Sequence, residues 1–182
     1  PIISDYDFDM LLEELTKLEN EFPDLKLPDS PSQRVGGTIV SEFKSAPHTY
    51  PMLSLSNTYS EAELRDFDTR IRKLVDGTIE YVCELKFDGL SISLTYEKGL
   101  LTRALTRGDG ERGDDVTTNI MTIRSIPLRL MGSGFPDLYE VRGEIILPRP
   151  GFEKMNQERI EIGETPFANP RNAAAGSIKL QD

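Results

Sequence analysis

The chain has 182 residues, of which 37% are hydrophobic, and it carries a formal net charge of −10 at pH 7. This length allows one large domain or a domain with a small appendage, and no apolar run approaches the roughly 18 residues of a membrane span. The single cysteine and single histidine, Cys83 and His48, exclude an internal disulfide and a Cys/His zinc cluster within this chain, so we expect a reduced, cytoplasmic setting without membrane contact.

A helix is predicted at the start of the chain. Ser4 and Asp7 have the spacing of a capping box, and apolar residues then recur at helical intervals, namely Phe8, Leu11, Leu12, Leu15, Leu18 and Phe22. Pro23 ends this helix, and residues 23–50 are rich in Pro, Gly, Ser and Thr, which predicts an extended connector. We expect residues 1–42 to form a small helical subdomain and residues 43–182 to form the main domain.

The main domain is predicted to combine helices with antiparallel strands. A helix begins at Ser60 and stops at Asp76-Gly77. Alternating apolar residues predict strands at Ile79–Lys86, Leu90–Tyr96, Leu100–Thr106 and Leu138–Leu147. Two further helices are predicted, at Gly151–Ile160 and at Arg171–Ala175, the latter behind an Asn169-Pro170 start signal. Short hairpin-sized turns between strands favour an antiparallel α+β fold over a parallel, doubly wound one.

The segment Tyr81–Leu90, YVCELKFDGL, is the first candidate for chemistry. On a strand, Glu84, Lys86 and Asp88 would project to the same side, and partial burial beside charges is how a nucleophilic lysine is tuned. The alternative is an ordinary edge strand with a solvated Lys-Asp pair. K-x-D-G resembles the adenylated-lysine motif of covalent nucleotidyltransferases, a group that includes DNA ligases, RNA ligases and mRNA capping enzymes.

A glycine-rich stretch follows the third predicted strand, TRGDGERGDDVTTN at Thr106–Asn119. Its glycines would let backbone amides approach a phosphate, and Arg107, at a strand end, could bind a phosphate or ribose oxygen bidentately. The alternative is a simple hairpin turn at Asp109-Gly110.

The sequence EVRGE puts Glu140, Arg142 and Glu144 on one face of a predicted strand. A solvated outer face is the ordinary interpretation of such alternating charge. The functional interpretation is that Glu144 meets the lysine-bearing strand and holds Mg²⁺ or a ribose, because carboxylate oxygens suit that ion.

The run FANPRNAAAGSIK at Phe167–Lys179 is compatible with a plain alanine-rich helix. Arg171, however, falls in the first turn, where the helix dipole favours acids over bases. A cation there suggests an anionic partner that the free amides of the helix start could also bind.

In that order, ELKFDG, TRGDGERGDDVTTN, EVRGE and FANPRNAAAGS resemble the adenylation domain of bacterial NAD⁺-dependent DNA ligase. The glycine-rich and the last motif distinguish this family from ATP-dependent ligases and capping enzymes. PMLSL at Pro51–Leu55 and DSPSQRVG at Asp29–Gly36 also match the family pattern, so the resemblance covers practically the whole chain.

The resemblance implies a nucleotide site. Lys86 would attack the α-phosphate of NAD⁺ and carry AMP, with Asp88 orienting it. Glu84 would read the adenine, Ser54 and Leu55 would line the base pocket, and Arg107 and Glu144 would contact the ribose and phosphates. Arg171 would bind nucleotide phosphate, and Asp5 and Asp9 on the first helix would recognise the nicotinamide half.

The resemblance has departures. Phe8 stands where the family has a tyrosine, and Lys179 stands where an arginine is common. The chain is expected to be truncated at both ends: a tyrosine-bearing segment would precede Pro1, and the later lysine-bearing motifs would follow Asp182. The oligonucleotide-binding fold, zinc module, helix-hairpin-helix array and BRCT domain would also lie downstream.

By this resemblance the parent protein is an NAD⁺-dependent ligase that seals nicks in duplex DNA during repair and replication, with Mg²⁺ as a cofactor and zinc only downstream. We expect a monomer. Two alternatives stay open: an ATP-using RNA ligase or capping-type enzyme, and a non-catalytic module that binds adenosine nucleotides.

Overall fold

The computed structural model describes residues 3–34 and 43–180. The side chain of Asp5 lies outside the described part, as do Val35 and Gly36 and the segment that ends at the expected domain boundary between residues 42 and 43. The fold is α+β with antiparallel strands, as the sequence predicts.

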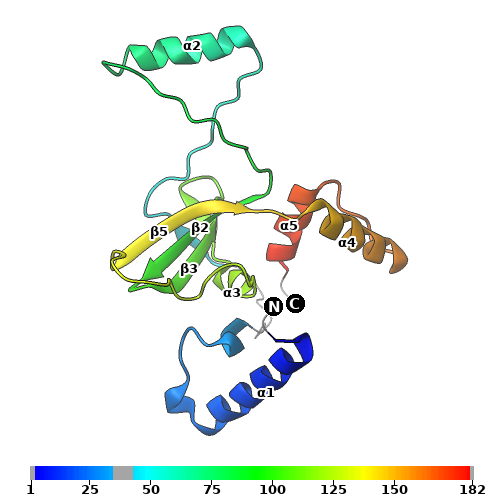
Figure 1. Cartoon of the computed structure of the whole chain (residues 1–182). Helices are drawn as coiled ribbons and strands as arrows, with labels where there is room; N and C mark the ends of the chain where they lie inside the picture. The colour runs from blue at the N-terminus through cyan, green and yellow to red at the C-terminus, as the bar shows by residue number, and fades with distance from the viewer. Residues whose placement is uncertain (1–2, 35–42, 181–182) are drawn as a thin grey trace.

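A three-stranded antiparallel sheet forms the centre of the molecule (Figure 1). β2 (Leu90–Glu97) is its middle strand, flanked by β3 (Leu100–Thr106) and by β5 (Leu138–Ile145). β2 and β3 form the predicted hairpin, and β5 returns along the other side of β2 with Ser91 opposite Glu144. All three strands are confirmed, although β5 ends two residues before Leu147.

A second, smaller pairing was not predicted. β1 (Ser45–Pro47) pairs with β4 (Arg112–Asp114), with Ala46 opposite Gly113. The short helix α3 (Thr117–Met121) follows at once. Three-residue strands and a five-residue helix are too short to display a period of 2.0 or 3.6 residues, which is why the sequence pattern misses them.

The hydrophobic core lies between the sheet, α3 and the last helix. Its buried members come from β2, β3, the segment around α3 and the end of the chain: Ile92, Tyr96, Leu101, Ala104, Val116, Ile120, Ile126, Leu128 and Ile178. The Tyr96 hydroxyl donates to the Pro127 carbonyl at 2.9 Å, so the one polar atom of the largest core side chain is paired. Burial of each large apolar side chain contributes roughly 1.5–3 kcal/mol, which makes this the rigid part of the chain.

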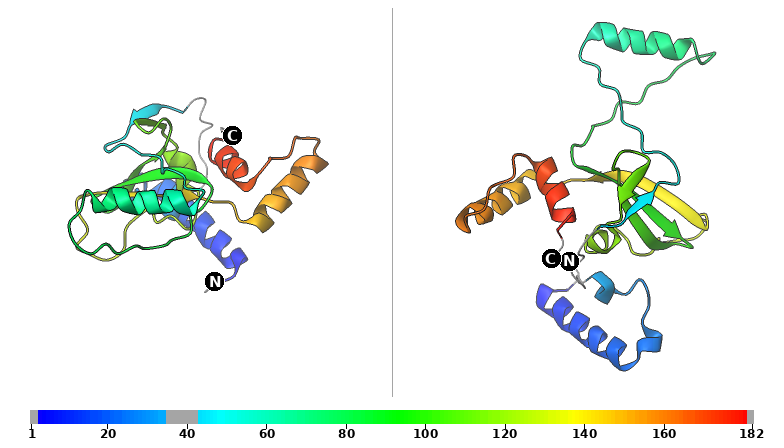
Figure 2. Two further views of the ribbon diagram at one scale, coloured as in Figure 1. Left: turned by 90° about the horizontal axis from the view of Figure 1, so that it is seen from above. Right: turned by 180° about the vertical axis from the view of Figure 1, so that it is seen from behind.

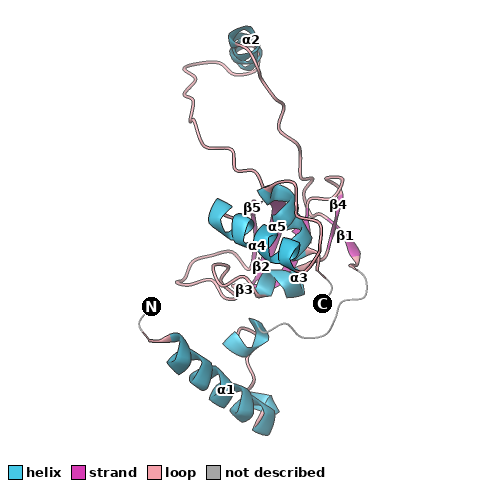
Figure 3. Ribbon diagram, turned by 90° about the vertical axis from the view of Figure 1, so that its right-hand side faces the viewer, coloured by secondary structure: helices cyan, strands magenta, loops and turns pink. Residues whose placement is uncertain are grey.

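Helices surround the core on two sides. α1 (Asp5–Glu21) begins at the predicted cap, where Ser4 Oγ accepts the Asp7 N–H at 3.2 Å, and is followed by two 3₁₀ turns, η1 (Pro23–Leu25) and η2 (Pro31–Arg34). This helical unit and α2 (Glu61–Arg72) lie on opposite sides of the sheet in the front view (Figure 1) and in the back view (Figure 2). α4 (Arg149–Glu161) and α5 (Pro170–Ile178), both predicted as helices, lie together after β5 (Figure 3).

The predicted strand at Ile79–Lys86 is wrong. Residues 53–87 leave the sheet, form α2 (Glu61–Arg72) and return as an extended chain that pairs with no described strand (Figure 1). A strand needs a hydrogen-bonding neighbour as well as alternation, and both sides of β2 are already taken by β3 and β5. The segment instead contacts α2, where the Tyr81 hydroxyl donates to Asp68 at 2.7 Å.

Candidate functional site

A basic pocket of about 270 Å³ opens where β2 begins and β3 ends, beside α5. Three cationic side chains line it from two parts of the chain: Arg107 after β3, and Arg171 and Lys179 at the two ends of α5. Apart from Leu90, the rest of the lining is small or polar: Gly89, Ser91, Thr106, Gly108, Asn172 and Ala175. A small opening with several guanidinium and ammonium donors suits a phosphate-bearing ligand.

Arg107 is placed by the end of the β2–β3 hairpin. Its backbone N–H donates to the Ser91 carbonyl at 3.2 Å, and its Nη1 donates to the Ser54 hydroxyl at 2.8 Å. Two residues that the sequence predicted for the nucleotide site, Ser54 and Arg107, are therefore in direct contact.

The glycine-rich loop after Arg107 is held closed by the side chain of Asp109. Asp109 Oδ1 accepts the N–H groups of Arg112 at 2.8 Å and Glu111 at 2.9 Å, and these hydrogen bonds lower the pKa of the Asp109 carboxyl. Gly108 has φ +58°, and a Cβ there would lie 1.9 Å from the Arg112 carbonyl oxygen. Only glycine fits this turn, so the loop holds Arg107 in one place.

The segment leading to Ser54 is fixed at three points. The backbone N–H groups of His48 and Met52 donate to the carbonyls of Glu111 and Gly110, at 2.9 and 2.8 Å. Arg142 Nη1 donates to the Pro51 carbonyl at 2.8 Å. Sequence reasoning placed Arg142 on a charged strand face but gave it no role; the structure shows it pinning the chain beside the pocket.

The glycine of the K-x-D-G motif is anchored to β5. The Gly89 N–H donates to Glu144 Oε1 at 3.1 Å, and the Ser91 hydroxyl donates to Oε2 at 2.7 Å. A Cβ on Gly89 would lie 2.1 Å from the Ile145 carbonyl oxygen, so a side chain would push the turn off the sheet. Just before it, Asp88 lies 3.7 Å from Arg171, an exposed pair of modest energy.

Lys86 and Glu84 do not line the pocket. Both are exposed, in the extended segment that the structure leaves unpaired. The expectation that one strand face presents Glu84, Lys86 and Asp88 is therefore wrong, because that strand does not form. Of the three, only Asp88 contacts a pocket residue.

Ser54 and Leu55 line a second, larger cavity of about 730 Å³ against the apolar face of α2. Leu55 is 78% exposed, so this cavity is an open surface rather than a closed slot. Ser54 thus lies between the basic pocket and the α2 surface.

Two pocket residues, Lys179 and Asn172, escaped sequence reasoning as site residues. Lys179 Nζ lies 2.6 Å from Asp114 Oδ2, which ties the end of α5 to β4. The spacing of Arg171, Ala175 and Lys179 at i, i+4 and i+8 puts all three on one helix face, and this signal was available in the sequence.

Glu144, the expected Mg²⁺ ligand, is engaged in hydrogen bonds with the K-x-D-G turn and β2. Both carboxylate oxygens already accept hydrogen bonds, and Asp88 faces Arg171. Within residues 3–34 and 43–180, no three His, Cys, Asp or Glu side chains gather as a metal site made by protein ligands alone would require.

The expected nicotinamide contacts lie on α1, which contributes no lining residue to the basic pocket. Asp9 is exposed, and the side chain of Asp5 is outside the described part. Phe8 packs under the guanidinium of Arg124, 5.4 Å from the ring centre.

Across the described ranges, no helix is both long and apolar enough to cross a membrane.

Two family models match the chain. One, described as the NAD-dependent DNA ligase adenylation domain, matches residues 40–182, and the other, described as the DNA ligase-like, N-terminal NAD⁺-binding domain, matches residues 1–36.

Curated relatives agree with these matches. The chain is 61% identical over 180 residues to a DNA ligase of Cytophaga hutchinsonii, 57% over 182 residues to one of Christiangramia forsetii, and 58% over 182 residues to one of a Thermoanaerobacter species. These alignments cover 99–100% of this chain, and the chain spans 27% of the length of each relative.

Proposed function

The chain belongs to the NAD-dependent DNA ligase family, and from that premise we propose that the protein carrying it transfers AMP from NAD⁺ to Lys86 and then to a nick in duplex DNA. The observation that carries this proposal is the position of the K-x-D-G turn. Its glycine is held by Glu144 and its aspartate pairs with Arg171, so the turn borders the basic pocket.

The place of Lys86, two residues before Asp88, supports the proposal that its amine reaches a phosphate in that pocket. An extended chain spans at most about 3.6 Å per residue, so the Cα atom of Lys86 lies within about 7 Å of that of Asp88. The lysine side chain then covers several further ångströms. Its exposure in the described chain leaves the amine open to an incoming nucleotide.

The proposed reaction consists of three successive nucleophilic displacements, each at a phosphorus atom. The free amine of Lys86 attacks the AMP phosphorus of NAD⁺, the P–O bond to nicotinamide mononucleotide breaks, and the amine loses a proton. The adenylate next moves from Lys86 to the 5′-phosphate of the nick. The 3′-hydroxyl finally attacks that phosphate and releases AMP, which closes the strand.

We assign the cations of the pocket to phosphate binding. Arg107, Arg171 and Lys179 can each donate to phosphate oxygens, and such charge-assisted hydrogen bonds are stronger than neutral ones. They would offset the charge that develops on the diphosphate as the leaving nucleotide departs.

Other roles rest on the family resemblance. Glu84 would read the adenine beside Ser54 and Leu55, and Asp5 and Asp9 would recognise the nicotinamide half. The contacts of Glu144 support a role in positioning the K-x-D-G turn. Each of its oxygens keeps a lone pair for Mg²⁺, which we propose as the cofactor, held by one carboxylate together with nucleotide phosphates and water. We further propose a cytoplasmic monomer acting in DNA repair and replication.

A labelling experiment tests the proposal. The full-length protein is incubated with NAD⁺ or ATP labelled in the adenylate, denatured and separated on a gel. We expect label from NAD⁺ only, lost in Lys86→Ala and in Lys86→Arg. Label from ATP alone would move the protein to the ATP-using families, and adenosine binding without covalent label would favour a non-catalytic module.

A further inference from the structure

We propose that Arg34 is a positioning residue for the reaction with NAD⁺, and that the Asp29–Arg129 ion pair assists it. Together they fix the N-terminal helical unit (residues 3–34) on a docking segment (Thr117–Leu130) of the main domain. The inference rests on the proposed function, because the effect concerns where the NAD⁺-binding unit lies during adenylation.

Arg34 alone binds three backbone carbonyls of the docking segment. Nη1 donates to Met121 at 3.2 Å and to Ile123 at 2.9 Å, and Nη2 donates to Ile126 at 2.8 Å. Met121 is the last residue of α3, where carbonyls lack partners within the helix and the dipole favours a cation. The guanidinium therefore caps α3 from a residue 87 positions earlier in the chain.

The docking segment is a firm support. Ile120, Ile126 and Leu128 are buried in the core, next to the carbonyls that Arg34 binds. Leu128 also accepts the Leu101 N–H at 2.9 Å, which joins the segment to β3. A contact made here is made to the most rigid part of the molecule.

Two more contacts cross the same junction. Arg129 donates to Asp29 in an ion pair, and this hydrogen bond lowers the pKa of the Asp29 carboxyl. Arg124 stacks on the Phe8 ring of α1. All three contacts from the helical unit end on the docking segment.

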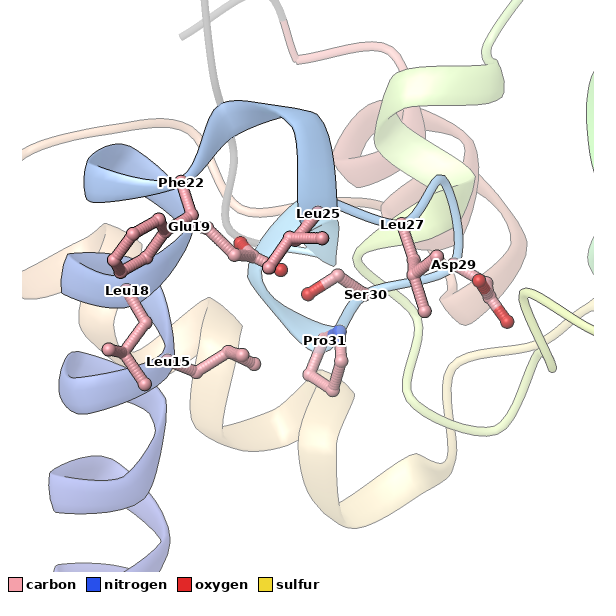
Figure 4. Close-up of a pocket in the computed structure, with 9 residues that line it drawn as sticks. All are labelled: Leu15, Leu18, Glu19, Phe22, Leu25, Leu27, Asp29, Ser30 and Pro31. Carbon is pink, nitrogen blue, oxygen red and sulfur yellow. The ribbon is translucent and has the colours of Figure 1, made fainter.

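The turn that ends at Arg34 is also tied to α1, and Figure 4 shows Glu19 of α1 beside Ser30 in the segment just before that turn. The buried Glu19 of α1 accepts the Ser32 hydroxyl, and Ser32 and Ser30 lie 3.1 Å apart through their hydroxyl oxygens. These bonds lower the pKa of Glu19, with Ser30 the larger cause and Ser32 the next. A displacement at Arg34 is therefore passed to the helix that carries Asp9.

The consequence is selective for one step. The nicotinamide half leaves in the first displacement, so later steps do not need the NAD⁺-binding unit in place. Loss of the Arg34 contacts should slow adenylation by NAD⁺ while sealing of a nick that already carries the 5′-adenylate proceeds.

The test uses the full-length protein and compares these two reactions. Arg34→Ala is expected to lower kcat/KM for NAD⁺ by about tenfold or more, since each hydrogen bond to a charged group is worth roughly 1.5–3 kcal/mol. Sealing of the pre-adenylated nick should change by less than about twofold. Arg34→Lys should resemble Arg34→Ala, because a lysine cannot span three carbonyls as a planar guanidinium does.

A second variant guards against misfolding. Arg129→Ala removes a half-exposed side chain from the same junction and should produce the same selectivity with a smaller loss. Lys154→Ala, on the exposed face of α4, is the matched control and should leave both reactions unchanged. Equal losses in both reactions for Arg34→Ala and Arg129→Ala, or wild-type kinetics with NAD⁺ for both, would overturn the inference. A wild-type protein that takes no AMP from NAD⁺ would instead contradict the proposed function itself.

Discussion

The sheet region and the excursion at residues 53–87 differ in almost every physical respect. The sheet region buries Ile92, Tyr96 and Ala104 nearly completely and pairs its strands on both sides of β2. The excursion exposes its apolar residues, with Leu85 and Val82 each 83% exposed, and it carries the lysine on which the proposed chemistry depends.

This difference distinguishes the residues fixed to the sheet region, which form a scaffold, from Lys86, the proposed nucleophile. The fixed residues of the pocket are tied to the sheet region by hydrogen bonds: the Arg107 backbone N–H donates to Ser91 and its carbonyl accepts from Gly110, and the Gly89 N–H donates to the Glu144 side chain. Lys86 is joined to that scaffold through the two residues that precede Gly89. In the proposed function, an amine on an exposed segment beside fixed phosphate donors would accept AMP and pass it on without disturbing the core.

The largest expected effect is the loss of nick-sealing activity when the proposed nucleophile is removed. Lys86→Ala should reduce nick sealing by NAD⁺ by on the order of 10³-fold or more, because it removes the nucleophile. Because the side chain is exposed, the melting temperature should stay within about 1 °C of the wild type. A large fall in melting temperature would show that Lys86 has a structural role, contrary to this account.

The next largest effect is a difference in stability between a substitution in the sheet region and one in the excursion. Ile92→Ala should cost roughly 2–5 kcal/mol of unfolding free energy, because it leaves a cavity in the core, whereas Leu85→Ala should cost less than about 0.5 kcal/mol. Denaturant-dependent hydrogen exchange of the β2 amides measures both. Similar costs at the two positions would mean that residues 79–87 are packed in solution.

A smaller effect concerns the pocket cations. Arg171→Ala and Lys179→Ala should each weaken AMP binding about tenfold, since each loses a charge-assisted contact, and the loss should shrink as salt is added. Calorimetric titration gives both values. Lys154→Ala serves again as the control, and unchanged affinity in both pocket variants would move the phosphate site elsewhere.

The smallest effect is a pH dependence of the glycine-rich loop. The pKa of Asp109 is lowered by the Arg112 and Glu111 amides, so its ionised form stabilises the folded loop at pH values above the ordinary aspartate value of about 4. This stability is lost as pH falls through the lowered pKa. Amide exchange in residues 107–112 should therefore quicken below about pH 4, and less so in Asp109→Asn. Equal pH profiles for the two proteins would contradict the assignment.

Much of the fold was readable because its signals are local. Ser4, Ser60 and Asn169 cap the three helices that the sequence places there, and each side chain accepts a hydrogen bond from the backbone N–H three residues on. The β2–β3 hairpin follows from alternation and a two-residue turn.

The predictions that failed depend on contacts between residues that are far apart in the sequence. Alternation at Ile79–Lys86 matches that of β2, yet pairing depends on a partner elsewhere in the chain, which no local pattern specifies. The Ser54–Arg107 contact and the three carbonyls bound by Arg34 likewise join residues more than 50 positions apart. Local patterns in the sequence pointed to Arg107, Arg171 and Glu144 as site residues and the family resemblance gave them roles, but the contribution of Lys179 to the pocket was missed.

The most direct measurement locates the adenylate on the full-length protein. After reaction with NAD⁺ in the absence of DNA, the protein is digested under conditions that preserve phosphoramidates, and the peptides are analysed by mass spectrometry. We predict one adenylate on Lys86, which disappears when nicked DNA is added. Adenylate on another lysine, or none on a protein that still seals nicks, would contradict the account.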